Sequence, residues 1–277
     1  MTLPMPVLDT HCHFWDLSRG DYDWLNGSGG PLAPIRRDFL PADFPAAHRV
    51  IAVQAAATLA ETDFLLELAA QNDAIAGVVG WVDLTRPGSV TVLQDRAANP
   101  LFKGIRPMLQ NIADTDWLMT QARPEVIETV TRLGLRFDAL VTERHLPMLE
   151  RFVAAHPDLP VMIDHCAKPQ PGARPEWEKG MRALARHPRV MCKFSGLPSE
   201  LSPAERVAPQ AAVVHVLSQL LEWFGPERLV WGSDWPVLTL AASYLDWQSL
   251  SRDVLAHLPQ DQQAAIFHGN GARFYGI

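Results

Sequence analysis

The stretch Met5-Pro6-Val7-Leu8-Asp9-Thr10-His11-Cys12-His13 joins a short apolar run to three ionisable side chains. The apolar run is typical of a buried strand, and residues two apart on a strand point to the same face. Asp9, His11 and His13 are therefore expected on one face at or near the end of this strand. Polar side chains in a buried strand cost free energy unless a pocket, a metal or a substrate compensates them. The stretch thus predicts an active site at the end of the first strand.

Seven further apolar runs follow along the chain and alternate with helical patterns. With the first they give eight predicted strands, at residues 7–13, 50–56, 75–82, 102–109, 135–141, 160–165, 190–196 and 229–234. Continuous apolar strands separated by helices indicate a parallel sheet covered on both faces. Eight such units favour an α/β fold closed into a (β/α)8 TIM barrel, with residues 1–277 as one domain. No Gly-x-Gly-x-x-Gly follows the first strand, which argues against a dinucleotide-binding fold.

The segments between the strands carry helix signals. Thr58-Leu-Ala-Glu61 is a capping-box pattern that predicts a helix start. Pro124 begins and Gly134 ends a second predicted helix. Ser202-Pro203-Ala-Glu205 opens a long helical stretch that runs to Phe224.

Composition narrows the classes of function. The chain has 277 residues, of which 48% are hydrophobic, and a formal net charge of -7. It has no basic stripe for nucleic acid and no apolar run near the ~18 residues that span a bilayer. The N-terminal residues lack the pattern of a secretory signal, and the sparse, odd set of 3 cysteines indicates a reducing compartment. We therefore expect a cytoplasmic protein with a small-molecule substrate and neither nucleic-acid nor membrane partners; the oligomeric state stays open.

Residues 14–49 form an unusually long connection with little helical period. Loops of this length within a compact domain are usually functional or disordered. Tyr22 and Trp24 are among its aromatic residues, and they favour a packed lid over the mouth of the barrel. The alternative is a surface excursion folded on itself.

The C-terminal ends of barrel strands form the active site in enzymes of this fold. Residues that the predicted strands bring to this end and to the interior are Gln54, Arg106, Asp138, His165, Lys193 and Asp234, beside His11 and His13 of the first strand. Structural alternatives remain for several of them. Arg106 and Asp138 could form a buried salt bridge with each other. Lys193 could extend to the rim of the barrel, and Asp234 could cap the helix that follows it.

Four segments of the chain resemble a known family. They are Asp9-Thr-His-Cys-His-Phe-Trp-Asp16, Asp164-His-Cys-Ala-Lys-Pro169, Cys192-Lys-Phe-Ser-Gly-Leu197 and Trp231-Gly-Ser-Asp-Trp-Pro236. Together they are similar to the amidohydrolase superfamily, and within it to the amidohydrolase-2 branch of sugar-acid lactonases. This branch contains L-fuconolactone and L-rhamnonolactone hydrolases and is related to 2-pyrone-4,6-dicarboxylate lactonase. The resemblance covers nearly the whole chain.

The resemblance implies a distorted barrel that hydrolyses a lactone, with His11, His13, His165 and Asp234 as catalytic residues. Binuclear members of the superfamily have a bridging Lys or Glu on the fourth strand, where this chain has Arg106, so a binuclear centre is disfavoured. Two alternatives remain open for the cofactor. Either none is required, or one divalent cation is bound by the same four residues, with zinc the best suited to imidazole and carboxylate ligands.

The expected mechanism is attack of water on the lactone carbonyl with Asp234 as general base. Donors from the histidines or Lys193 would stabilise the oxyanion. The residues expected to bind the substrate are Arg106, Lys193, Tyr22, Trp24, Trp235, Gln54 and Asp138. The alternatives are a metal-dependent decarboxylase of the same branch and a non-catalytic barrel that binds a sugar acid.

Overall fold

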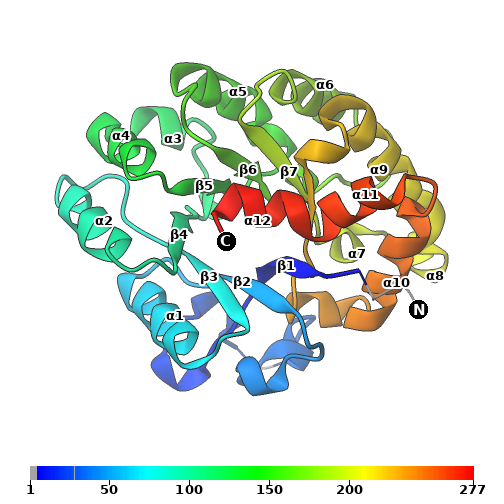
Figure 1. The fold of residues 1–277 in the computed structure, drawn as a ribbon, viewed down its shortest axis with the longest axis horizontal. Coiled ribbons are helices and arrows are strands. Elements are labelled where there is room, and N and C mark those ends of the chain that lie inside the picture. Colours follow the sequence, from blue (N-terminus) through cyan, green and yellow to red (C-terminus); the bar gives the residue numbers. More distant parts are fainter. Residues whose placement is uncertain (1–4, 28) are drawn as a thin grey trace.

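The computed structural model describes residues 5–27 and 29–277. In this part of the chain eight parallel strands follow one another in chain order around a sheet (Figure 1). They are β1 Leu8–Cys12, β2 Arg49–Val53, β3 Ile75–Gly80, β4 Phe102–Ile105, β5 Arg136–Ala139, β6 Val161–Ile163, β7 Val190–Phe194 and β8 Leu229–Trp231. A parallel bridge joins Cys12 to Trp235, and the Asp234 N–H donates to the His11 carbonyl (2.8 Å), so the end of β8 returns to β1. The predicted (β/α)8 barrel is confirmed.

Helices connect the strands and surround them (Figure 1). The α-helices are α1 Leu59–Gln71, α2 Ser89–Ala97, α3 Trp117–Thr120, α4 Pro124–Arg132, α5 Leu146–Ala155, α6 Pro175–Leu184, α7 Leu197–Glu200, α8 Pro203–Val207, α9 Pro209–Phe224, α10 Tyr244–Leu255, α11 Gln260–Ala264 and α12 Asn270–Tyr275. Short 3-10 turns include η5 Leu109–Asn111, η6 Glu143–His145 and η7 Asp164–Ala167. No helix among the described residues has the length and apolar character needed to cross a membrane.

The interior of the barrel is apolar at its N-terminal end. Strand side chains and α12 meet there, through Leu8, Ile51, Val53, Val79, Met162, Met191, Val230, Phe274 and Tyr275. The Arg136 guanidinium on β5 donates to the Phe274 carbonyl, and Lys103 on β4 donates to the Gly276 carbonyl (3.0 Å). These contacts fix α12 across the N-terminal ends of the strands, and the polar residues collect at the opposite end.

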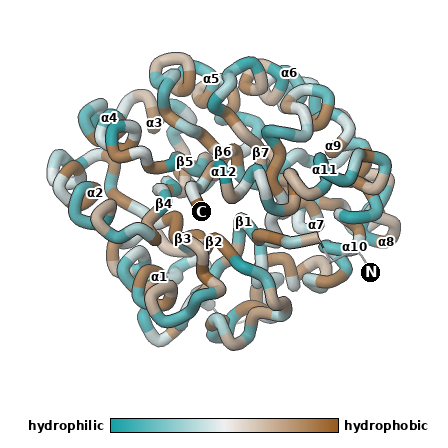
Figure 2. Tube along the Cα trace, viewed as in Figure 1, coloured by the Kyte–Doolittle hydropathy of each residue, from teal (hydrophilic) through white to brown (hydrophobic). Residues whose placement is uncertain are grey.

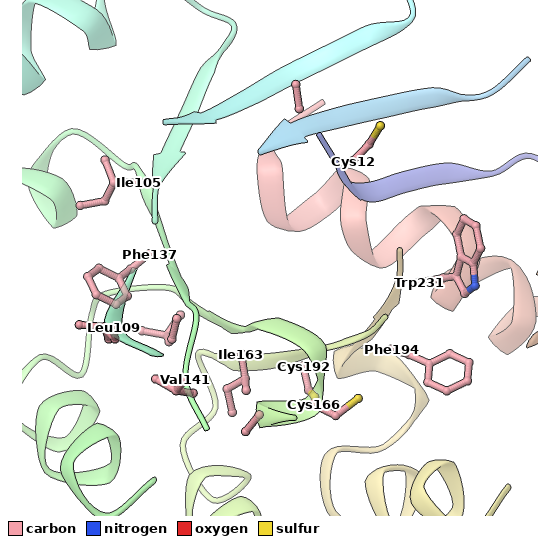
Figure 3. Close-up of a cluster of buried hydrophobic side chains, with 14 of the residues drawn as sticks. Cys12, Ile105, Leu109, Phe137, Val141, Ile163, Cys166, Cys192, Phe194 and Trp231 are labelled. Atoms are coloured by element: carbon pink, nitrogen blue, oxygen red, sulfur yellow. The ribbon is translucent and has the colours of Figure 1, made fainter. Parts of the chain in front are cut away.

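A second apolar layer lies between the strands and the surrounding helices. Figure 3 shows part of it, with Ile105, Phe137, Ile163 and Phe194 contributed by four consecutive strands. In Figure 2 the strands are mostly brown, whereas the helices alternate brown and teal turns, as expected of helices that bury one face. Each fully buried Leu, Ile or Phe contributes about 1.5–3 kcal/mol, so this layer is a major source of stability.

The predicted elements agree with the structure except at their ends. β4 ends at Ile105 and β6 at Ile163, whereas the predicted strands continue to residues 109 and 165. The residues beyond the last ladder bond leave the sheet and turn toward the cavity at its end. Thr58 caps α1 as predicted, since its hydroxyl accepts from the Glu61 N–H (3.0 Å). The predicted helical stretch from Ser202 is interrupted at Ala208, because a residue that precedes proline disfavours helical backbone.

Candidate active site

A cavity of about 300 Å³ lies at the C-terminal end of the barrel. It is lined by His13, Trp24, Ala55, Arg106, Met108, Gln110, Asn111, Leu140, His165, Lys168, Asp234 and Val237. Its lining therefore includes three of the four predicted catalytic residues together with Arg106 and Lys168. The fourth, His11, lies directly beneath them and is fully buried.

His11, His13 and Asp234 form a compact cluster at the base of this cavity. The Nε2 atoms of His11 and His13 are 3.2 Å apart, and Asp234 Oδ1 lies 3.3 Å from His13 Nε2 and 3.8 Å from His11 Nε2. His13 Nδ1 donates to the Val53 carbonyl (2.7 Å). A carbonyl can only accept, so this bond leaves the Nε2 lone pair of a neutral His13 facing Asp234.

Asp9 does not join this cluster. Its carboxylate accepts from the Ser233 N–H (2.8 Å) and the His11 N–H (3.2 Å) instead of facing the cavity. The prediction that Asp9 shares a face with His11 was wrong, because the register of β1 against β2 shifts between Asp9 and Cys12. Such an irregularity turns the following side chains relative to the preceding ones. Burial raises the pKa of Asp9 to about 6.

A buried network of charges lies below the cavity. Lys193 Nζ donates to Asp138 Oδ2 (2.5 Å) and lies 3.0 Å from Asp164 Oδ1 and 3.2 Å from His11 Nδ1. The Arg106 guanidinium lies 3.6 Å from Asp164 Oδ2 and 3.3 Å from His11 Nε2. Arg106 thus pairs with Asp164, whereas the sequence suggested Asp138 as its partner, and Lys193 stays buried instead of extending to the rim.

The two carboxylates of this network differ in their electrostatic surroundings. Burial raises the pKa of Asp138 to about 6, although the Lys193 ammonium opposes this shift. Burial also acts on Asp164, but Lys193 and Arg106 outweigh it, and the pKa of Asp164 is lowered. Both carboxylates and Lys193 have no exposed surface, so they position Arg106 and His11 and do not themselves line the cavity.

Gln54 also supports Arg106 and does not line the cavity. Its amide donates to the Arg106 carbonyl (2.7 Å), and the Arg106 guanidinium donates to the Gln54 carbonyl. This reciprocal pair fixes the backbone of the two strand ends and orients the guanidinium. The expected contact between Gln54 and substrate is therefore not supported by its position.

His165 is held in place by a left-handed turn that follows β6. Its Nδ1 lies 2.9 Å from Ser195 Oγ, and its Nε2 lies 3.8 Å from Asp234 Oδ1. Gly196 has a φ of 66°, and a Cβ atom there would lie 2.6 Å from His165 Nδ1. Glycine is therefore required at this position for the imidazole to reach the cavity.

Beyond His13, the described part of the segment between β1 and β2 contributes Trp24 to the cavity. Trp24 lines it, and its Nε1–H donates to the Ala55 carbonyl (2.8 Å). Tyr22 is buried and donates its hydroxyl to Glu61 Oε2 (2.6 Å), so it anchors this segment to α1. Burial raises the pKa of Glu61 to about 7.

Trp235 does not form the opposite wall of the cavity. It is buried among aromatic side chains, with its ring centroid 5.9 Å from that of Phe14, 5.3 Å from that of Phe39 and 5.4 Å from that of Phe44. Its position supports a packing role, against aromatic side chains of the segment between β1 and β2.

The pKa values of His11, His165 and Asp234 are shifted from their ordinary values. Burial lowers the pKa of His11 well below its ordinary value, and the charges of Lys193 and His13 act in the same direction. Burial likewise lowers the pKa of His165. Burial raises the pKa of Asp234, but the charges of His165 and His13 outweigh it, so the net direction is down. The sequence left this balance open; the geometry favours an ionised carboxylate.

The cluster fits one divalent cation. The ligand atoms of His11, His13 and Asp234 lie within 4.8 Å of one another. Two imidazoles and one carboxylate are a donor set that zinc binds. His165, the fourth predicted ligand, is not part of this group. Because Arg106 donates toward His11 Nε2, a bound cation would have to replace that contact.

Three polar residues that line the cavity were not among the site residues predicted from the sequence. Gln110 and Asn111 lie on η5, after the apolar run that was taken as part of the fourth strand, so their position depends on where β4 ends. Lys168 reaches the cavity only because of the left-handed backbone after β6. The sequence signal for Lys168 is its place in the segment Asp164–Pro169, directly after the predicted end of the sixth strand.

Comparison with known sequences identifies the family. Residues 8–277 match the profile of the amidohydrolases. The chain belongs to the amidohydrolase family. This agrees with the resemblance seen in the four sequence segments.

Similar amidohydrolases include proteins of known activity. L-fucono-1,5-lactonase from Burkholderia ambifaria is 39% identical, with 98% of this chain and 95% of that protein covered. L-fucono-1,5-lactonase from Burkholderia multivorans is 37% identical, with 98% and 96% covered. A solved amidohydrolase structure from Burkholderia multivorans with bound zinc is 34% identical with a TM-score of 0.86, and covers 98% of this chain and 99% of its own.

Proposed function

We propose that this amidohydrolase hydrolyses the ring ester of a sugar-acid lactone, of the L-fucono- or L-rhamnono-lactone type. The similarity to two L-fucono-1,5-lactonases along almost the whole chain supports the substrate class. The observation that carries the proposal is the meeting of Asp234 with the imidazoles of His13 and His165 in one cavity. A carboxylate and imidazoles at one point suit acid–base chemistry on an ester.

Asp234 is the proposed general base. Its carboxylate accepts a proton from a water molecule as the water oxygen forms a bond to the lactone carbonyl carbon. The bond between that carbon and the ring oxygen then breaks, and the proton passes from Asp234 to the departing ring oxygen. The product is an open-chain hydroxy acid, which releases a proton to become a carboxylate.

Arg106 and His165 are the proposed donors to the oxyanion of the tetrahedral intermediate. Both line the cavity beside Asp234 and are held by buried partners, Arg106 by Asp164 and His165 by Ser195. Donors that are already oriented stabilise the developing charge without reorganisation in the transition state. His11 and Lys193 support this arrangement from below.

We further propose that the cluster binds one zinc ion through His11, His13 and Asp234, whose ligand atoms lie close together. The bound zinc of the similar amidohydrolase from Burkholderia multivorans supports the choice of metal. When bound, such an ion lowers the pKa of a coordinated water and polarises a carbonyl oxygen. Hydrolysis assayed with and without a chelator decides whether the ion is required.

The polar rim of the cavity suits a polyhydroxylated ring. Gln110 and Asn111 offer amide donors and acceptors, while Trp24 and Leu140 offer apolar surface. Sites that combine apolar walls with a few placed polar groups orient small ligands by hydrogen bonding.

The three free and buried cysteines support a location in a reducing compartment such as the cytoplasm.

The test is acid release from aldonolactones in weak buffer with a pH indicator. We expect turnover of L-fucono-1,5-lactone or L-rhamnono-lactone above the rate of spontaneous hydrolysis. Release of carbon dioxide from an aromatic acid, abolished by chelation, would instead identify a decarboxylase. Tight binding of lactones without turnover would identify a sugar-acid-binding barrel.

A further inference from the structure

The chain after β6 adopts a strained conformation. His165, Cys166, Ala167 and Lys168 have φ values of 51°, 53°, 57° and 53°, and none of them is glycine. The left-handed region costs an L-residue roughly 1–2 kcal/mol, so four consecutive residues represent a considerable cost. Strain of this kind persists only where the surroundings enforce it, and it concentrates at functional sites.

Surrounding groups enforce this turn. The Trp177 indole donates to the Cys166 carbonyl (2.7 Å), and the Cys166 thiol donates to the Lys193 carbonyl (3.1 Å). The Lys168 N–H donates to the His165 carbonyl (2.8 Å). The result is that His165 and Lys168, three positions apart, both line the cavity that contains Asp234.

Lys168 differs from the other cations at the site. Arg106 is 3.6 Å from the buried Asp164, and Lys193 contacts the buried Asp138, so each has a carboxylate partner inside the protein. Among the described residues, Lys168 forms an ion pair only with Glu200 of α7, at an Nζ–Oε1 distance of 3.5 Å. Its side chain keeps 24% of its surface exposed and is therefore free to face a ligand.

The reaction proposed above creates negative charge where a neutral substrate was bound. In the intermediate the negative charge moves from Asp234, which has accepted the proton, to the former carbonyl oxygen of the substrate. After the product has released its proton, its carboxylate lies close to the again ionised Asp234, so two negative charges face each other. An unscreened pair of that kind is unfavourable unless a cation lies nearby. Lys168 is a cation on the wall of the same cavity.

We propose that Lys168 is a further catalytic residue, whose ammonium group stabilises the oxyanion and the product carboxylate. The inference rests on the proposed lactone hydrolysis. Lys168 keeps its protons throughout, so the bonds formed and broken are those already described. Glu200 is a positioning residue that holds the Lys168 side chain at the rim of the cavity.

A purely structural role makes a different prediction. As an ion pair between partly exposed groups, Lys168–Glu200 contributes about 0–1 kcal/mol, so its loss would change stability slightly and leave catalysis intact. Catalytic stabilisation of an oxyanion predicts a large loss of kcat instead. Removing one such donor typically lowers kcat about 100- to 1,000-fold.

The experiment compares Lys168→Met, Lys168→Arg and Glu200→Gln with a matched control. The control is Lys179→Met, which removes an exposed lysine of α6 that lies 3.9 Å from Glu176. We expect Lys168→Met to lower kcat about 100-fold with little change in KM, and Lys168→Arg to recover part of the loss because it keeps the charge. Glu200→Gln gives a smaller loss, and Lys179→Met gives none.

Three outcomes overturn the proposal. One is a kcat for Lys168→Met within about threefold of wild type, measured on protein with an unchanged thermal midpoint. Another is a change confined to KM, since uniform binding does not accelerate the chemical step. The third is equal loss in Lys168→Met and Lys168→Arg, because charge would then not matter. If the wild type opens no lactone, both the proposed function and the role of Lys168 fail. If the wild type opens lactones and the Lys168 variants do so equally well, only the role of Lys168 fails.

Discussion

Replacing Lys193 with Met should destabilise the protein strongly, because the ammonium group is buried beside two buried carboxylates. Lys193 contacts Asp138 at 2.5 Å and Asp164 at 3.0 Å, and all three residues are fully buried. Methionine has a similar volume but leaves both carboxylates without this cation. Removing one partner of a buried ion pair typically costs about 3–5 kcal/mol, and here two anions lose the same partner.

The measurement is thermal and urea unfolding at several pH values. For a chain of this size, about 4 kcal/mol corresponds to a shift of the midpoint by roughly 8 °C. The pKa of Asp138 is already raised to about 6 by burial, and loss of Lys193 raises it further. When a carboxyl group has a raised pKa in the folded state, the stability of the protein falls as pH rises. The loss of stability in Lys193→Met is therefore larger at pH 8 than at pH 5.

The double variant Lys193→Met/Asp138→Asn is the internal control, since it removes a positive and a negative charge together. It should recover part of the lost stability, while the exposed Lys179→Met should lose almost none. A loss below about 1 kcal/mol for Lys193→Met, or a deficit that is independent of pH, would refute this view of the buried network.

Three further predictions concern the contact between Tyr22 and Glu61, the metal and the substrate. Burial raises the pKa of Glu61 from 4.5 to about 7, so the contribution of Glu61 to protein stability falls as pH rises through this interval. In urea unfolding between pH 4.5 and pH 8, Glu61→Gln should remove about 3 kcal/mol of that pH dependence. Chelator-treated protein should bind one zinc ion in calorimetry, and His13→Ala should abolish binding; unchanged binding would exclude the His11–His13–Asp234 cluster as the site. Asn111→Ala should raise KM for a polyhydroxylated lactone by up to about 10-fold with kcat preserved, as expected for one lost hydrogen bond, and an unchanged KM would remove Asn111 from substrate recognition.

The fold could be predicted from the sequence because its signal is repeated. Eight apolar runs alternate with helices, and all eight are strands in the structure. The strand ends could not be predicted, since apolar residues such as Leu109 continue beyond the last ladder bond into the turns around the cavity. Periodicity does not indicate where a strand leaves its sheet.

The candidate site was predictable where strand parity holds. His13, His165 and Asp234 line one cavity, while their catalytic roles remain predictions. Parity failed for Asp9 because a shift in register separates it from Cys12. Parity also does not apply to Lys168, which follows the predicted strand end, since four left-handed residues have no simple sequence signal when none of them is glycine.

The most direct test of the proposed mechanism is the turnover of Asp234→Asn. Asp234 has a φ of 65°, a conformation that asparagine also adopts readily, so this substitution removes the charge and keeps the backbone. We expect a folded protein with wild-type thermal stability to within a few degrees and a kcat for lactone opening reduced about 100- to 10,000-fold. Near-normal turnover by the folded variant would contradict the assignment of this carboxylate as the base.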